Sequence, residues 1–277
     1  MPYSKVTGIV TRYVDYKEND RILSIFTLER GRIDANARGC RRPKSPLLPA
    51  AQPFVYGEFE LFVSKDRAAV NQVNIQEPFF PLREDAERFA AASSAMQLVH
   101  EASQEEEKNE DLFYLLYYTL TFLAYGEAAP QDLFLCFLSK YLDVIGYRPV
   151  LTTCVQCGKD LRLEKEVFYS ISSCGAVCSA CSTGAWAVSK TSLEAIRRMI
   201  YLDFRDMDRV KISDRFRSEL FRVLSGQVEH FFDYGTKALA YYTDFLKQIR
   251  LIEKKTQTNG KKSVIIFKFE FVLSINF

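Results

Sequence analysis

The sequence predicts an α+β protein of several domains, in which a small β-barrel precedes a helical domain that a cysteine-rich module interrupts. Residues 1–80 are rich in β-branched and aromatic residues and contain no helical stretch. From Pro81 onward, apolar residues recur at every third or fourth position, which is typical of helices. Residues 154–182 then hold five of the seven cysteines, with helical patterns on either side.

Five short runs in the first part predict strands, separated by glycine, proline or charged turns. In the fourth run, Phe59, Leu61 and Val63 alternate with Glu58 and Glu60, so one face is apolar. Five strands in so short a stretch fit a small closed or partly closed barrel, with an SH3-like barrel as the main alternative. The runs are residues 5–14, 21–31, 32–39, 54–64 and 68–76.

Helices are expected next. The spacing of Phe89, Ala92, Met96 and Val99 predicts one helical face, and apolar stretches at 111–126 and 131–147 predict two buried helices. Gly126 and Gly146 stand where helix ends are expected.

Beyond the cysteines, Thr191-Ser-Leu-Glu194 predicts a capping box, and a further helical region is expected from Ser213 to Ile249. The predicted domain limits are residues 1–80, 81–150, 151–186 and 187–253, and the tail, 254–277, is assigned no role.

Composition narrows the class of protein. The 277 residues are 48% hydrophobic and 26% charged, as in ordinary globular proteins, and no apolar run is long enough for a membrane span. The first ten residues lack the pattern of a secretory signal, so we expect an intracellular protein with reduced thiols. The net charge of +2 is unevenly distributed: residues 1–80 carry 12 Lys and Arg against 9 acidic residues, and residues 81–150 carry 5 against 12. Any nucleic-acid surface must therefore be local.

The cysteines form two C-x-x-C pairs, Cys154 with Cys157 and Cys178 with Cys181, separated by 20 residues. This spacing is typical of a zinc ribbon, in which four thiolates complete a tetrahedral site. Gly158 follows the first pair directly, where the turn often needs positive φ. We expect one structural zinc ion, because four cysteines close the coordination shell and the chain's two histidines, His100 and His230, are distant in sequence.

The other three cysteines receive no ligand role. Cys174 is expected to be a spare thiol near the second pair, with a swapped ligand or a redox partner as alternatives. Cys136 falls in an apolar helix and is expected in the core. Cys40 lies in a basic loop, where arginines could lower its pKa, but a bystander role is favoured.

A basic run is the second candidate site. Between Arg30 and Lys44 there are six cations (Arg30, Arg32, Arg38, Arg41, Arg42, Lys44) and one acidic residue, Asp34. Such a loop on a small barrel suits the phosphate backbone of single-stranded nucleic acid, although a solvated charged loop is the alternative. The aromatic residues Tyr13, Tyr16, Phe26 and Phe54 are candidates for base stacking.

Catalytic motifs are missing. The sequence contains no phosphate-binding G-x-x-x-x-G-K-[ST], no G-x-S-x-G and no H-E-x-x-H, which argues against an enzyme. The acidic run "EEEKNED", residues 105–111, is interpreted as a solvated helix end.

The chain resembles the bacterial recombination mediator family RecO. The resemblance rests on "TGIVTRYVDYKENDRILSIFTLERGRIDANARGCRRPKS" at residues 7–45, on "QPFVYGEFELF" at 52–62 and on the C-x-x-C pairs within a helical region. It covers roughly residues 1–250, departs from the family where Cys174 replaces one glycine of a pair, and fails beyond about residue 253.

This resemblance implies an N-terminal OB-fold rather than an SH3-like barrel, followed by a helical domain with a zinc module. It implies a protein that binds single- and double-stranded DNA and anneals complementary strands without ATP. It also implies loading of recombinase onto coated DNA with RecR, often RecF, and the C-terminal tail of the single-strand DNA-binding protein. A cytoplasmic, nucleoid-associated location follows. The implied DNA contacts are Arg38, Arg41, Arg42 and Lys44, with Arg12, Lys17 and Arg21 as weaker candidates.

Two other functions stay open at this point. The barrel could bind protein, with an incidental basic loop, and the chain would then be an interaction scaffold. A zinc-dependent hydrolase acting on nucleic acid is the less favoured alternative.

Overall fold

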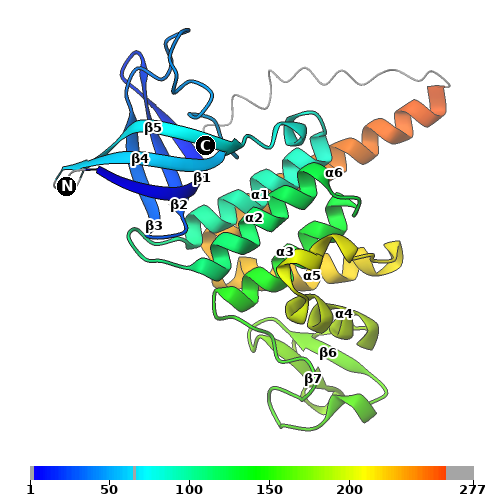
Figure 1. Ribbon diagram of the computed structural model, residues 1–277. Helices are drawn as coiled ribbons and strands as arrows, with labels where there is room; N and C mark the ends of the chain where they lie inside the picture. The colour runs from blue at the N-terminus through cyan, green and yellow to red at the C-terminus, as the bar shows by residue number, and fades with distance from the viewer. Residues whose placement is uncertain (1–2, 65–66, 260–277) are drawn as a thin grey trace.

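The computed structural model describes residues 3–64 and 67–259. A β-barrel packs against a bundle of helices, and a small three-stranded sheet lies at the far end of the bundle (Figure 1). The barrel strands are β1 (Tyr3–Tyr16), β2 (Asp20–Thr27), β3 (Gly31–Ala37), β4 (Tyr56–Ser64) and β5 (Arg67–Glu77). All five predicted strands are therefore present.

The barrel closes in the order β1-β2-β3-β5-β4, with β1 pairing back to β4 and β3 running parallel to β5. This closed five-stranded arrangement confirms the OB-fold. Alternation supplies the interior, because Ile33, Ala35 and Ala37 on β3 and Phe59 and Leu61 on β4 all face one buried cluster.

The outside of the barrel is also buried on one side. Ile9, Phe26 and Phe54 belong to the core of the helical domain rather than to the barrel interior. The ring of Phe26 lies 5.8 Å from that of Phe113, and the ring of Phe54 lies 5.6 Å from that of Phe89. Phe26 and Phe54 were expected to stack on bases; this is wrong, because helices cover both rings.

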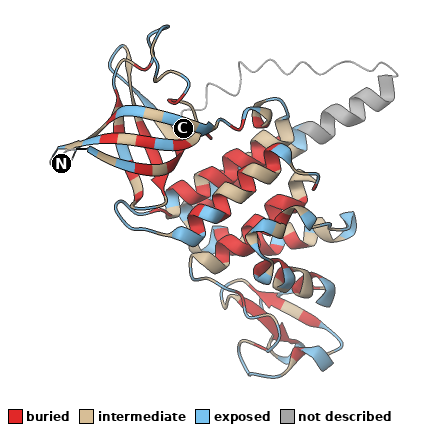
Figure 2. Ribbon diagram, in the orientation of Figure 1, coloured by how far each residue is buried: buried red, intermediate tan, exposed pale blue. Residues whose placement is uncertain are grey.

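The helices share a single core that extends into the small sheet (Figure 2). Gly126 and Gly146 follow the second and third helices, as expected, and Gly146 has φ +88°. None of the helices among the described residues combines the length and apolar character that a bilayer span requires. The helices are α1 (Ala86–Ala102), α2 (Glu110–Tyr125), α3 (Pro130–Val144), α4 (Lys190–Tyr201), α5 (Asp214–Phe231) and α6 (Asp233–Asn259).

Three helix boundaries differ from the prediction. Helix α4 begins after Ser189, whose side chain accepts from the Ser192 amide, and not after Thr191; Glu194 bonds Arg197 and Arg198 instead of closing a capping box. The region after Ser213 is two helices, because the chain turns at Phe232. Helix α6 also continues to Asn259, past the predicted limit at residue 253, and residues 260–277 of the tail lie outside the described residues.

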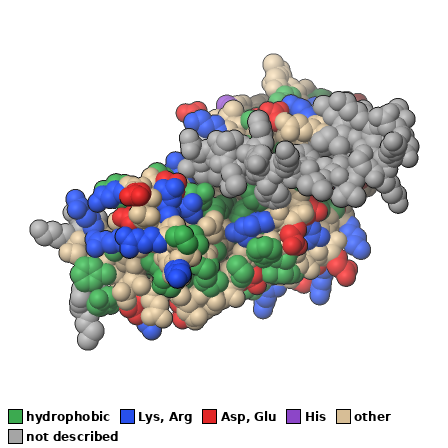
Figure 3. All heavy atoms as spheres, turned by 90° about the horizontal axis from the view of Figure 1, so that it is seen from above, with side chains coloured by type: hydrophobic (Ala, Val, Ile, Leu, Met, Phe, Trp, Pro, Cys, Tyr) green, Lys and Arg blue, Asp and Glu red, His purple; other side chains and the backbone are tan. Residues whose placement is uncertain are grey.

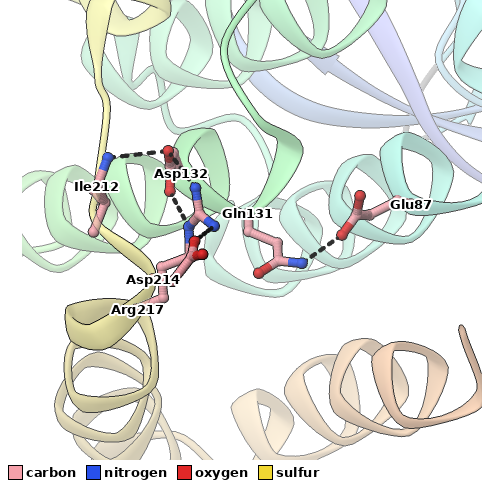
Figure 4. A network of polar contacts seen from close by, with 6 residues as sticks. All are labelled: Glu87, Gln131, Asp132, Ile212, Asp214 and Arg217. Carbon is pink, nitrogen blue, oxygen red and sulfur yellow. Dashed lines mark hydrogen bonds and ion pairs between the residues drawn. The ribbon is translucent and has the colours of Figure 1, made fainter. Parts of the chain in front are cut away.

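A polar network holds α5 against α3 (Figure 4). The buried carboxylate of Asp132 accepts from Arg217 Nε at 2.7 Å and Nη2 at 3.0 Å, and from the Ile212 amide at 3.1 Å. On the other side, Gln131 donates to Glu87 of α1 at 2.6 Å. The start of α3 is thus fixed to two neighbouring helices by charge-assisted hydrogen bonds.

His100 lies at the contact between α1 and the barrel. Its Nδ1 is 3.1 Å from Thr11 Oγ1, and that hydroxyl donates its own proton to the Ser24 carbonyl at 3.1 Å. The hydroxyl must therefore accept, so Nδ1 carries the imidazole proton. Burial, then the nearby Arg32, lowers the pKa of His100, so the folded protein holds it neutral.

This burial predicts acid sensitivity. The unfolded chain binds a proton on His100 below a pKa of about 6.5 and the folded chain resists it, so stability falls as pH drops through that range. Urea midpoints measured between about pH 7.5 and about pH 5 should fall less in His100→Gln than in the wild type. His230→Gln, at an exposed position on α5, is the control and should follow the wild type. If the urea midpoint fell equally with pH in all three proteins, His100 would not be the source of the acid sensitivity.

Candidate nucleic-acid interface and metal centre

The basic loop, residues 38–53, joins β3 to β4 at the end of the barrel away from the helices (Figure 1). It is tied to the β1–β2 turn, because the Gly39 amide donates to Asp20 Oδ1 at 2.7 Å and the Arg41 amide donates to the Asn19 carbonyl at 3.0 Å. Gly39 has φ +63°, a conformation that favours glycine. These bonds bring exposed Lys17 of the turn beside the loop.

Five exposed cations define what we call the barrel-end patch: Lys17, Arg38, Arg41, Arg42 and Lys44. Lys and Arg side chains gather over the barrel in the view from above (Figure 3). Arg41 lies 3.5 Å from Asp15, whereas the described residues provide no ion pair for the other four. Exposed, uncompensated cations are available to phosphate groups.

Arg21, a weaker DNA-contact candidate from the sequence, is held in place by contacts within the barrel. Its Nε donates to Asp15 at 2.9 Å, its Nη1 donates to the Ala51 carbonyl at 2.7 Å, and its guanidinium lies 3.8 Å from the ring centre of Tyr13. These contacts bind the far end of the basic loop to the barrel wall. They also cover Tyr13. Tyr16 is the most exposed of the four stacking candidates, at 41%, and Lys17 Nζ lies 5.2 Å from its ring centre.

Arg12, another weaker DNA-contact candidate, lies on β1 and away from the basic loop. A bulge separates Val10 from Arg12 on β1, and Arg12 then pairs in register with Ser24 of β2. Its Nε is buried and has no hydrogen-bond partner among the described residues. Arg12 thus lies outside the barrel-end patch, partway along the strands.

The four cysteines of the two C-x-x-C pairs come together. Their Sγ atoms all lie within 4.8 Å of one another, and those of Cys157 and Cys178 are 3.8 Å apart. Four thiolates about 2.3 Å from a tetrahedral zinc ion would be about 3.8 Å apart, so the cluster fits such an ion. The second pair lies within a three-stranded sheet of β6 (Val167–Ser170), β7 (Gly175–Cys178) and β8 (Trp186–Val188), because Cys178 ends β7 and Cys181 precedes β8. Gly158 has the expected positive φ, +75°.

The thiol pKa values differ across the cluster. Burial raises the pKa of Cys154, but hydrogen bonds from the backbone at Cys178, Cys157 and Gln156 outweigh it and lower the value to about 6. A hydrogen bond with Cys178, then burial, raises the pKa of Cys181 to about 12. The Cys154 thiolate forms readily whereas the Cys181 thiol resists ionisation, and a bound cation would favour the thiolate form of both.

The remaining cysteines lie outside the cluster. Cys174 has φ +51° and lies at the β6–β7 turn, where its Sγ is 3.3 Å from the Tyr147 carbonyl and also contacts Gln227. Burial raises the pKa of Cys40, so the basic loop does not activate it. Burial likewise raises the pKa of Cys136 to about 12, as befits a core thiol.

Lys140 joins α3 to the end of α4, and sequence reasoning missed it. This buried side chain on α3 donates from Nζ to the carbonyls of Ile200, at 3.1 Å, and Leu202. A cation there satisfies the last carbonyls of α4 and complements its helix dipole. The signal was a single lysine within the apolar run "CFLSKYL".

Comparisons with known proteins agree with this architecture. A family model described as Recombination protein O N terminal matches residues 1–79, and one described as Recombination protein O C terminal matches residues 83–231. The chain belongs to the RecO family of DNA repair proteins. The two RecO models together span the barrel, the bundle as far as α5 and the cysteine module, and α6 lies beyond them.

Proteins named DNA repair protein RecO resemble the chain over most of its length. The one from Acetivibrio thermocellus is 31% identical over 226 residues, 80% of this chain and 89% of the relative. That from Symbiobacterium thermophilum is 32% identical over 232 residues, 82% and 92% of the two chains. That from Caldicellulosiruptor saccharolyticus is 30% identical over 253 residues, 90% and 100% of the two chains.

The setting of Arg21 predicts a structural role. Arg21→Gln removes charge-assisted bonds to Asp15 and Ala51 and should lower the free energy of unfolding by about 1.5–3 kcal/mol. Arg42→Gln, at an exposed position, should change it by less than about 0.5 kcal/mol. Urea denaturation of both variants checks this, and equal stability losses would contradict it.

Proposed function

We propose that this protein binds DNA through the barrel-end patch, anneals complementary single strands and helps to load recombinase onto DNA coated with single-strand DNA-binding protein. The observation that carries the proposal is the gathering of exposed cations on an OB-fold end in a family of DNA repair proteins. Contacts to phosphate neutralise charge without reading sequence, so binding should be salt-sensitive and tolerant of base composition.

Annealing follows from the same electrostatics. Two DNA strands repel each other, and cations that bind both lower the repulsion without ATP or a catalytic residue. The proposed contacts are Arg38, Arg41, Arg42, Lys44 and Lys17, with Arg12 as a peripheral contact, whereas the bonds of Arg21 favour a structural role. The helical domain would provide docking surfaces for RecR, the tail of the single-strand DNA-binding protein and possible partner RecF, in the bacterial cytoplasm.

We also propose that the metal is a single structural zinc ion bound by Cys154, Cys157, Cys178 and Cys181. Thiolate-only ligation and the tetrahedral spacing favour zinc. A closed shell of four ligands leaves no position for a reacting water, which disfavours the hydrolase alternative.

The DNA proposal predicts the effect of Arg41→Ala with Arg42→Ala. Loss of two phosphate contacts should weaken single-strand binding and reduce the slope of log affinity against log salt by about 1.4. Anisotropy with a labelled oligonucleotide measures binding, and annealing of oligonucleotides coated with single-strand DNA-binding protein measures function. Arg205→Ala with Arg209→Ala is the control, since it makes the same charge change at ion-paired arginines remote from the barrel.

If both double variants bound and annealed like the wild type, the patch would not be the DNA site. If the wild type held protein partners at high salt and retained no DNA, the scaffold alternative would replace the proposal.

The zinc proposal predicts metal content. The purified protein should carry one zinc ion per chain, Cys157→Ser should lose it, and Cys174→Ser should keep it. Elemental analysis with thermal melting checks this. A Cys157→Ser protein that retained full zinc, or a wild type with another metal, would refute it.

A further inference from the structure

An acidic segment of the helical domain lies on the barrel. Residues 103–109 connect α1 to α2. Their acidic run is exposed and leads into the first turn of α2, as the sequence predicts, but it also bonds to the barrel. The Arg32 amide donates to the Gln104 carbonyl at 3.1 Å, and the Glu106 amide donates back to the Arg32 carbonyl at 3.4 Å. The segment therefore forms an isolated parallel β-bridge with the start of β3, between Glu105 and Arg32.

The approach of the two backbones is close. Gly31 has φ +66°, and a Cβ built there would lie 2.2 Å from the Glu107 carbonyl oxygen. Only glycine fits at that position, so the start of β3 is shaped to receive this segment.

Two carboxylates of the segment neutralise two cations of the basic run. Glu106 Oε2 accepts from Arg30 Nε at 3.0 Å and Nη2 at 2.5 Å, so the guanidinium presents its forked edge to one oxygen. Glu105 Oε1 accepts from Arg32 Nη2 at 3.3 Å. Phosphate oxygens bind the same edge of arginine, so the carboxylates stand where phosphates could bind.

A strip of polar side chains on the outer face of the barrel leads from these arginines toward the barrel-end patch, and several of its polar atoms lack a hydrogen-bond partner among the described residues. Alternation places Arg32, Asp34 and Asn36 on the outer face of β3, which spans about 20 Å before Arg38. Arg12 lies two strands across, level with Asp34 through Ser24. Four buried side-chain atoms lack a partner among the described residues, and three belong to this strip: Arg12 Nε, Arg32 Nε and Asn36 Oδ1.

We propose that this strip extends the nucleic-acid site from the barrel-end patch to Arg30 and Arg32, and that Glu105 and Glu106 occupy its far end until a phosphate chain displaces them. The inference rests on the proposed DNA binding and adds a competing anion within the chain. Displacement is feasible because both carboxylates are solvent-accessible: the side chain of Glu106 is 59% exposed and that of Glu105 is 66% exposed. Exposed pairs of this kind are weak and screened by salt.

The test is Glu105→Gln with Glu106→Gln, measured by anisotropy with a labelled single-stranded oligonucleotide over a salt series. Releasing two arginines to phosphate should tighten binding and steepen the slope of log affinity against log salt by about 1.4. The gain in affinity should accordingly be about sevenfold larger at about 50 mM than at about 200 mM salt.

Two further proteins separate this effect from a general change in charge. Glu127→Gln with Glu166→Gln makes the same charge change at exposed positions outside the strip and should give a smaller gain. In an Arg30→Gln background, the Glu105 and Glu106 substitutions should steepen the slope of log affinity against log salt by only about half as much. The reason is that Arg32 is then the one arginine that they release to phosphate. Thermal melting confirms that each protein is folded. Arg30 is a safer background than Arg32, because among the described residues its side chain bonds to Glu106 alone, whereas Arg32 also bonds to the His100 carbonyl.

Each outcome either supports or overturns the inference. A gain above the charge control that shrinks in the Arg30→Gln background supports the inference. A gain equal to the control, a gain unchanged by Arg30→Gln, or no gain overturns it. If the wild type itself binds no oligonucleotide, the proposed DNA binding fails first and the inference falls with it.

Discussion

The apolar contact between the outer wall of the barrel and helices α1 and α2 is the constraint on which the rest depends. Ile9, Phe26 and Phe54 are fully or almost fully buried there, although they point away from the barrel interior. Burial of such side chains stabilises by about 1.5–3 kcal/mol each, and three together prevent the barrel from turning independently. The position of the basic loop relative to the bundle is fixed in consequence.

Sequence pattern predicted most of what is local. Period-two alternation located the strands, and cysteine spacing identified the four residues that cluster, because both signals are contained in short stretches of chain. Long-range contacts were not readable. An outward Phe26 looks the same in sequence whether it meets water or a helix. The choice of Ser189 over Thr191 as cap likewise depends on Glu219, which accepts from the Ser189 amide at 3.0 Å.

Counting charges also misses how they are arranged. The helical domain has many arginines, but Arg197, Arg205 and Arg217 each lie within 3.0 Å of a carboxylate and form ion pairs within the chain. The loop at the end of the barrel has cations with no such partner among the described residues. The net charge of +2 therefore conceals an uneven arrangement, in which these arginines are paired within the helical domain and the cations at the barrel end are exposed.

The placement of Lys140 bears on the order of assembly. The chain leaves the bundle after α3 and returns as α4, and the Lys140 ammonium holds these two helices together by bonding the carbonyls at the end of α4. The helices on either side of the cysteine module are thus joined without a metal. A metal ion bound by the four cysteines would have only a short loop to close, which costs little chain entropy. Metal uptake would then be the last step of folding, and metal loss would disorder the module while the bundle keeps its shape.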